Sequence, residues 1–380
     1  MHRLIALDLP GGPGFVDVLR RCWDRGDAVV VIDQRLPAAA RAALISAARP
    51  HEVLTAPDAD PVPFDRAAPL VEPGDALIVT TSGSTGEPKA LVHTHDSLGA
   101  HATAVHRHLG VDPARDRWLA ALPLNHLGGF GVVARSLLTD TPVDVLPSFD
   151  VKVVAQSPGR LGSTLVSLVA AALDRVDPEP FRWVVLGGSA DPVVRPPNVV
   201  RTYGLTESGG GVVYEGTPLP GVEVRIGDDG EISIRSATIA RGRREHDGTV
   251  IPLADADGWL ATGDVGRWAN DGRLQVDGRR DDLIITGGEN VWPGPVEDAL
   301  RTHPAVADAL VVGEPDPDWG QRVVAVVVPA DPADPPTLDV LRTHAKDTLP
   351  PHAAPRELRL VNEIPRTALG KPVRTPAGKP

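Results

Sequence analysis

The chain has 380 residues, which is enough for two or three domains and too many for a small binding module. Its formal net charge of -12 predicts no broad basic surface, so we expect no nucleic acid partner and only local phosphate binding. Cys22 is the only cysteine, which excludes an intramolecular disulfide and a multi-cysteine metal cluster and favours a reducing, cytoplasmic setting. No stretch approaches the roughly 20 apolar residues of a membrane span, and we expect no targeting segment.

The first part of the chain has the pattern of a layered α/β domain. Apolar runs rich in β-branched residues end in small or polar residues, so each is predicted to be a buried strand that leads into a loop. These runs are Ala76–Thr81, Arg182–Leu186 and Asn198–Thr202. The Ala- and Leu-rich segment 163–175 between them is predicted to be a helix. In such domains ligands gather at the carboxyl ends of the strands.

The pattern changes after about residue 222. Short alternating runs at 222–226, 231–236 and 273–278 predict a small antiparallel β subdomain. A further composition shift places a domain boundary at 279–282. We therefore expect a large N-terminal domain of residues 1–280 and a small, mobile α+β domain of residues 281–380. In the second domain the predicted helices are 295–301 and 337–348, and the predicted paired strands are 309–313 and 322–328.

The segment 81–89, TSGSTGEPK, combines hydroxyls, glycines and one lysine directly after a predicted strand. Such a loop can turn its backbone N–H groups and hydroxyls toward phosphate oxygens, and the Lys89 ammonium adds a positive charge. It is not a Walker A loop, because Pro88 precedes the lysine and Ala90 follows it. As a bare pattern it also fits a flexible surface loop.

The order of the residues in this segment resembles the phosphate-loop signature of the adenylate-forming enzymes, the superfamily of acyl-CoA synthetases, adenylation domains and luciferases. Further segments similar to those of the superfamily follow in its order. They are Leu122–Gly129, Val185–Ala190, Tyr203–Ser208, Thr262–Asp264, Gly278–Glu297 and Ile364–Pro372. The resemblance implies an enzyme that uses ATP and Mg²⁺ to convert a carboxylic acid into an acyl-adenylate, and that commonly uses coenzyme A as the acceptor.

The resemblance also implies which residues bind the nucleotide. Tyr203 would stack on adenine, Thr206 would bond to the α-phosphate and Glu207 would ligate Mg²⁺. Taken singly, a tyrosine after a strand is usually a core residue and a Thr-Glu pair is a common helix cap. The residues implied to bind ATP or AMP are Thr81, Ser82, Gly83, Ser84, Thr85, Gly86, Lys89, Gly187, Gly188, Ser189, Ala190, Tyr203, Gly204, Asp264 and Arg279.

Two residues near the end of the chain are implied to act in catalysis and domain motion. Lys371 matches the lysine that bridges the carboxylate and the α-phosphate during adenylation, although a lysine near a terminus is ordinarily a solvated surface residue. Only five of the 38 Lys and Arg residues are lysines, which agrees with a specific role for this one. Asp281 matches the hinge around which the superfamily rotates its small domain.

The acceptor and acyl sites are implied by fewer residues. Contacts with coenzyme A are expected from Gly287, Gly288, Trp319 and Arg356, with Arg359 as an alternative to Arg356. The acyl pocket is expected to include His126, Arg135 and Ser208. Ordinary packing is the competing interpretation for Trp319 and for His126.

Stretches near residues 125–137 and 207–226 resemble those of short actinobacterial o-succinylbenzoate-CoA ligases of menaquinone biosynthesis. Three alternatives stay open. The first is a CoA ligase for another aryl or medium-chain acid, and the second is a carrier-loading adenylation enzyme. The third is a nucleotide-binding scaffold without activity, which the presence of Glu207, Asp264 and Lys371 disfavours. The sequence does not determine the oligomeric state, and a homo-oligomer is one of the outcomes it allows.

Overall fold

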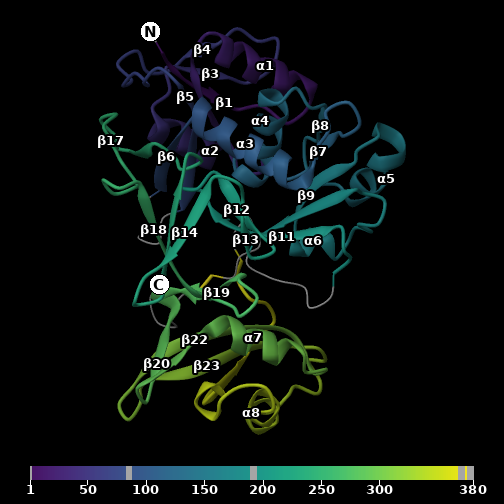
Figure 1. The fold of residues 1–380 in the computed structure, drawn as a ribbon, viewed down its shortest axis with the longest axis vertical. Helices are drawn as coiled ribbons and strands as arrows, with labels where there is room; N and C mark the ends of the chain where they lie inside the picture. Colours follow the sequence, from purple (N-terminus) through teal and green to yellow (C-terminus); the bar gives the residue numbers. More distant parts are fainter. Residues whose placement is uncertain (1, 83–87, 189–194, 367–372, 375–380) are drawn as a thin grey trace. The chain divides into compact units, whose positions relative to one another are not determined.

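The structure is a computed structural model that describes residues 2–82, 88–188, 195–366 and 373–374. It divides into two compact units, the first made of residues 1–224 and 233–261 and the second of residues 225–232 and 262–380. The predicted mixed α/β architecture with a smaller second part is confirmed (Figure 1). Asp281 lies inside the second unit. The sequence predicts that the small domain moves about a boundary at Asp281. The two compact units are defined by contacts within one conformation and do not test such a motion, so the boundary stays a prediction.

An eight-stranded sheet forms one part of the first unit. Its order is β17-β16-β6-β5-β2-β1-β3-β4, and β2 pairs in parallel with both β1 and β5. The strands are β1 (Leu4–Leu7), β2 (Ala28–Val31), β3 (Glu52–Leu54), β4 (Val62–Pro63), β5 (Asp75–Ser82), β6 (Pro88–Thr94), β16 (Gly242–Arg244) and β17 (Val250–Ile251). Every residue of β1 and β2 is buried, which explains their uninterrupted apolar sequences.

A seven-stranded sheet forms the other part of this unit, in the order β13-β12-β11-β10-β9-β7-β8. Its strands are β7 (Trp118–Ala120), β8 (Val143–Val145), β9 (Leu165–Val169), β10 (Trp183–Gly187), β11 (Val199–Leu205), β12 (Gly210–Tyr214) and β13 (Thr217–Pro218). The predicted strands before the motif loops are therefore confirmed. The helix predicted over 163–175 is wrong for most of its length, because residues 165–169 form strand β9 in the interior of this sheet. Only the short helix α6 (Ala170–Leu173) follows. A strand buried on both faces is apolar throughout, so its sequence has no alternation that would separate it from a buried helix.

The remaining helices of the first unit are α1 (Pro13–Asp24), α2 (Ala38–Ala48), α3 (His95–Leu109), α4 (Leu127–Leu138) and α5 (Val151–Leu161). Helix α3 contacts both β6 of the first sheet and β12 of the second, and it packs against α4. It starts directly after β6 with a capping box, in which Thr94 and Ser97 exchange side-chain and backbone hydrogen bonds of 3.0 Å. The strand before the helix and the helix itself are thereby fixed to each other.

The second unit is an α+β fold whose strands and helices match the predicted pairs within a few residues. A four-stranded sheet of order β14-β15-β18-β19 is formed by β14 (Val222–Ile226), β15 (Glu231–Ser236), β18 (Trp259–Trp268) and β19 (Leu274–Arg279), and the division between the two units falls within its first three strands. A sheet of five strands follows, in which β22 and β23 pair antiparallel as expected. Its elements are β20 (Ile284–Thr286), β21 (Glu289–Val291), α7 (Pro293–Arg301), β22 (Val306–Asp316), β23 (Gly320–Pro329), α8 (Leu338–Lys346) and β24 (Glu357–Leu360). No helix among the described residues is long and apolar enough to cross a membrane.

Candidate active site

The predicted phosphate loop connects the antiparallel strands β5 and β6. Thr81 lies opposite Lys89, and Ser82 lies opposite Pro88. The chain therefore approaches and leaves the loop as a β-hairpin, in contrast to the strand-to-helix entry of a Walker A loop. Lys89 is half-buried at the start of β6. The four predicted residues Gly83, Ser84, Thr85 and Gly86 lie outside the described residues.

The predicted adenine-binding residues come from the ends of two neighbouring parallel strands. Strands β10 and β11 are paired with Leu186 opposite Arg201, so Gly187 and Tyr203 follow the paired residues at the same edge. Gly188 has a φ of 103°, which side chains other than glycine rarely adopt. The predicted residues Ser189 and Ala190 lie outside the described part of the chain. Gly187, Gly188, Tyr203 and Gly204 are thus brought together at a carboxyl edge, as the sequence predicts.

Thr206 and Glu207 lie in a tight turn that follows β11, and both are half-buried. The Ser208 hydroxyl stabilises this turn, because it accepts a hydrogen bond from Leu205 N at 2.8 Å and lies 2.9 Å from Gly210 O. The carbonyl of Glu207 accepts a hydrogen bond from Ala240 N at 2.8 Å. Ser208 is fully buried, so in this structure its hydroxyl supports the turn. Its predicted contact with an acyl group stays a prediction.

Two buried histidines lie beneath this turn, and the sequence motifs did not point to them. His101 on α3 is 2.9 Å from Gly211 O through Nε2, and burial lowers its pKa to about 3, helped by the nearby Arg135. His93 on β6 has no exposed surface. Burial lowers its pKa to about 4, although the backbone of Thr206 partly opposes this. Neither ring nitrogen of His93 has a well-formed hydrogen bond among the described residues. Both rings are therefore neutral at neutral pH.

His126 and Arg135 are both on or beside α4 but have different surroundings. His126 precedes the helix, and burial lowers its pKa to about 4, with a further contribution from Arg35. Arg135 is only 5% exposed, and its guanidinium lies 4.7 Å from the centre of the Trp118 ring. Its Nε and Nη1 atoms have no hydrogen-bond partner in the described residues. Arg135 is thus an enclosed cation, and its role in an acyl pocket stays a prediction.

Asp264 and Arg279 form a pair in the second unit. They lie opposite each other on β18 and β19, with 2.9 Å between Arg279 Nε and Asp264 Oδ1. The arginine also donates to Thr262 O at 3.0 Å, and the Thr262 hydroxyl lies 3.1 Å from Asp264 N. Asp264 is 6% exposed and so keeps a fixed carboxylate. This is an arrangement in which a carboxylate can accept hydroxyl hydrogen bonds from a ribose.

The residues predicted to bind coenzyme A are brought together on the second unit. The Arg356 guanidinium lies 3.7 Å from the centre of the Trp319 ring, which is 42% exposed. Gly287 N donates to Trp319 O at 2.8 Å, and a Cβ at position 287 would lie only 2.6 Å from the ring. Gly287 and Gly288 both have positive φ, so the turn needs glycine twice. Arg359 points to a different role, because it pairs with Glu314 at 2.7 Å.

Asp281 lies in a short 3-10 helix, Arg280–Asp282, and is exposed, while Lys371 lies outside the described residues. The neighbouring Asp282 is partly buried, and this burial raises its pKa against the opposing effect of Arg374. An exposed aspartate beside a partly buried one is compatible with a change of backbone conformation at Asp281. The hinge role nevertheless stays a prediction.

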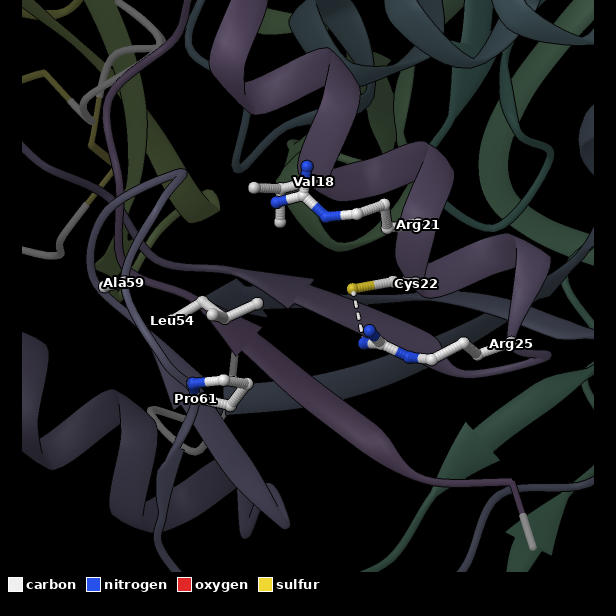
Figure 2. Close-up of a pocket in the computed structure, with 7 residues that line it drawn as sticks. All are labelled: Val18, Arg21, Cys22, Arg25, Leu54, Ala59 and Pro61. Carbon is white, nitrogen blue, oxygen red and sulfur yellow. Dashed lines mark hydrogen bonds between the residues drawn. The ribbon is translucent and has the colours of Figure 1, made fainter.

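A small cavity of about 90 Å³ lies beside α1, and none of the candidate site residues named above lines it (Figure 2). Cys22 lines it, and the sulfur lies 3.6 Å from Nη2 of Arg25. Burial raises the pKa of the Cys22 thiol to about 11, so the thiol is protonated and unreactive at neutral pH. The free cysteine is therefore a structural residue.

Two protein-family models match the chain. The model described as "AMP-binding enzyme" matches residues 24–242, which is more than half of the chain, and the "AMP-binding enzyme C-terminal domain" model matches residues 295–371. The second match includes α7, β22, β23 and the segment with Lys371. The two family models therefore match two separate parts of the chain.

Individual relatives agree with the family models. A "probable 2-succinylbenzoate–CoA ligase" of Mycobacterium tuberculosis is 42% identical over 80% of this chain and 84% of the relative. The 2-succinylbenzoate–CoA ligase of Listeria monocytogenes is 31% identical over 78% of this chain and 68% of the relative.

Among solved structures, the o-succinylbenzoate CoA synthetase of Bacillus subtilis with its acyl-adenylate intermediate is 26% identical, with a TM-score of 0.82 over 97% of this chain and 86% of that chain. An amide bond synthetase from Marinactinospora thermotolerans is 28% identical, with a TM-score of 0.80 over 97% and 88%. With the motif residues gathered at the strand ends, these matches establish that the chain belongs to the AMP-binding enzyme family.

Proposed function

We propose that this chain is an ATP-dependent carboxylate–CoA ligase that works in two half-reactions through an acyl-adenylate. The observation that carries the proposal is the turn Thr206–Glu207 beside Tyr203, at the carboxyl edge where β10 and β11 end. An edge of this kind binds a nucleotide, and the turn offers a hydroxyl and a carboxylate beside the aromatic ring. The CoA ligases among the relatives support the same activity.

In the first half-reaction a carboxylate oxygen of the substrate attacks the α-phosphorus of ATP, and the bond to the bridging oxygen of pyrophosphate breaks. Both reactants are anions, so local positive charge and donors are required. Lys89 and Lys371 supply the charge, and the Thr206 hydroxyl donates to the α-phosphate. Asp264 accepts the ribose hydroxyls, which fixes the nucleotide for in-line attack.

The described residues fit a magnesium ion that is shared with the nucleotide. No group of three or more His, Cys, Asp or Glu side chains able to hold a metal occurs in the described ranges, so a cage made only of protein ligands is not present there. Mg²⁺ is commonly held by one or two carboxylates together with substrate phosphates, which matches the single carboxylate of Glu207. When bound, the ion would neutralise phosphate charge. A solved structure of the Bacillus subtilis relative contains ATP and a magnesium ion.

In the second half-reaction the thiol of coenzyme A attacks the acyl carbonyl, and AMP leaves with the electron pair of the broken C–O bond. The exposed ring of Trp319 suits stacking on the adenine of coenzyme A, and Arg356 can contact its phosphates. Rotation of the small domain about Asp281 would bring this face to the adenylate.

We further propose 2-succinylbenzoate as the acid, because it is named in the relatives at 42% and 31% identity. This substrate has an aromatic ring and two carboxylates, so its pocket needs apolar surface and a source of positive potential. Arg135, His126 and Ser208 are the candidate residues for this pocket. The co-substrates ATP and coenzyme A are cytoplasmic metabolites, which supports a cytoplasmic location. The net charge of -12 supports a reaction without nucleic acid.

The test measures pyrophosphate release from ATP with a panel of acids, followed by mass spectrometry of the thioester. The expected result is turnover with 2-succinylbenzoate that exceeds turnover with benzoate and with succinate. Lys371→Ala should abolish pyrophosphate release while a preformed acyl-adenylate is still converted to the thioester. Equal loss of both steps would refute the role of Lys371, and no turnover with any acid would refute the ligase itself.

The acceptor is tested separately, because one structural relative is an amide bond synthetase. Coenzyme A and a set of primary amines are offered to the adenylate under the same conditions. Consumption of coenzyme A alone supports the ligase, and amide formation in its place would reassign the second half-reaction.

A further inference from the structure

The described residues just beyond Lys371 are bound firmly to the second unit. Arg374 donates to Glu297 Oε2 at 3.2 Å through Nη2 and contacts Oε1 of the same carboxylate through Nη1, so the two planar groups meet at two points. Nη1 also donates to Val311 O at 2.8 Å. The arginine therefore joins α7 and β22 at once. A two-point contact of this kind fixes orientation as well as distance.

Glu297 is a buried carboxylate that depends on this arginine. It is 4% exposed, and its Oε1 accepts a hydrogen bond from Val311 N at 2.8 Å. Arg301 is its other cationic neighbour, but the distance between Arg301 Nη2 and Glu297 Oε2 is 3.7 Å, which is too long for a hydrogen bond. A buried carboxylate is costly without a close cation, so the folded unit favours Arg374 in this position over a solvated one.

The chain before the lysine is bound to the same strand. Arg366 forms an ion pair with Asp308 on β22, three residues before Val311. Val373 N also donates to Pro365 O at 2.8 Å, so a described residue that follows Lys371 is hydrogen-bonded to a described residue that precedes it. The described residues on both sides of 367–372 are therefore bound to β22, and Arg374 follows Lys371 by only three residues in the sequence.

Arg374 also contacts the residue next to the predicted hinge. Its Nε lies 3.3 Å from Asp282 Oδ2, and Asp282 directly follows Asp281. The side chain therefore has three acceptors on three different elements, namely Glu297 on α7, Val311 on β22 and Asp282 in the 3-10 helix.

We propose that Arg374 is a positioning residue for adenylation, which holds the chain beside Lys371 against Glu297 and Val311 so that the lysine ammonium reaches the reacting phosphate reproducibly. The inference rests on the proposed function of Lys371. Arg374 itself does not touch the substrate. Its effect is confined to the half-reaction in which Lys371 acts.

The test compares Arg374→Gln and Arg374→Lys with the parent protein in both half-reactions. In Arg374→Gln we expect kcat for pyrophosphate release to fall by about 10²-fold with little change in KM for ATP, because displacement of a catalytic group of about 1 Å has such an effect. Conversion of a preformed adenylate to the thioester should stay at the parent level. Arg374→Lys keeps the charge without the two-point contact, so its kcat should be intermediate.

Arg301→Gln is the matched control. Arg301 is a neighbour of the same Glu297, binds Ala309 O at 2.7 Å and lies 3.3 Å from Oδ1 of Asp308, which keeps Arg366 as a second partner, and it is far along the chain from Lys371. Its substitution should lower stability without changing kcat for pyrophosphate release. A loss of kcat in Arg301→Gln equal to that in Arg374→Gln would show a general effect on the unit and overturn the proposal.

A double variant separates positioning from folding. If Arg374 acts only through Lys371, then Arg374→Gln added to Lys371→Ala should leave the conversion of a preformed adenylate to the thioester at the level of Lys371→Ala alone. A loss in the thioester step of the double variant overturns the proposal. If Lys371→Ala itself leaves release unchanged, the proposed function of the lysine fails first. If only the Arg374 variants leave it unchanged, the positioning role alone is refuted.

Discussion

His93 and His101 make the stability of the first unit sensitive to acid. Both rings are buried beneath the turn with Thr206 and Glu207, and burial lowers the pKa of His93 to about 4 and that of His101 to about 3. In the unfolded chain each histidine has a pKa near 6.5. The folded pKa is lower than the unfolded one, so the unfolded state takes up protons first on acidification. The contribution to stability is therefore complete above pH 6.5 and is lost as the pH falls toward 4.

The magnitude follows from proton linkage. At pH 5.5, protonation stabilises the unfolded state by about 1.4 kcal/mol for each histidine that stays neutral in the folded state. At pH 7.5 the same protonation contributes almost nothing. Two such residues predict a loss of about 3 kcal/mol in the free energy of unfolding between these pH values. This loss is a large part of the free energy of unfolding of a typical domain, which is roughly 5–15 kcal/mol.

The assay is urea unfolding at pH 7.5 and pH 5.5. His101→Gln removes the titrating group but keeps a donor for Gly211 O, so it should lose about 1.4 kcal/mol less than the parent protein over this range. His246→Gln, in an exposed turn, is the control and should match the parent. An equal pH dependence in the parent and in His101→Gln would refute the argument that a buried neutral ring causes the acid sensitivity.

Two further substitutions test the geometry of the proposed sites. Gly204→Ala should destabilise the first unit by about 3 kcal/mol, because its Cβ would lie 1.9 Å from Gly210 O on the paired strand. Gly99→Ala on α3 is its control, since a Cβ there meets nothing within 4 Å, and urea unfolding of both variants decides the point. Trp319→Ala should raise KM for coenzyme A about tenfold while pyrophosphate release is unchanged, because one base–aromatic stack is lost. Trp319→Phe should restore part of the affinity, and an unchanged KM in Trp319→Ala would place coenzyme A elsewhere.

The strands that lead into motifs were predictable because each is a short apolar run that ends at a turn. Strands β5 and β10 end where their sequences change to glycine and polar residues, whereas β11 continues through Tyr203 and Gly204 to Leu205, three residues beyond the predicted run. Strand β9 was not predictable in the same way. Its sequence LVSLV is apolar without alternation, and Ala-rich residues follow it directly. The pairing of its two edges with β7 and β10 determines that it is extended.

The predicted site residues separate into those fixed by local sequence and those that depend on distant partners. Asp264 and Arg279 are paired across two adjacent strands, so a short hairpin brings them together. Trp319 and Arg356 are also in contact, although neither sequence segment indicates the other. The buried partners were not predictable at all. His93 and His101 lack a motif, and Glu297 is 77 residues from Arg374 in a chain with many arginines.

The two units fix their functional residues by different interactions. In the first unit, backbone hydrogen bonds and the buried Ser208 hydroxyl stabilise the turn after β11 that carries Thr206 and Glu207. In the second unit, ion pairs between arginine and a carboxylate hold the functional residues in place, as in Arg279 with Asp264 and Arg374 with Glu297. Because Asp264 and Glu297 are buried, salt screens these pairs less than it screens surface pairs. Substitution of either arginine should therefore slow adenylation even at high ionic strength, whereas a surface pair such as Arg115 with Asp112 should become dispensable.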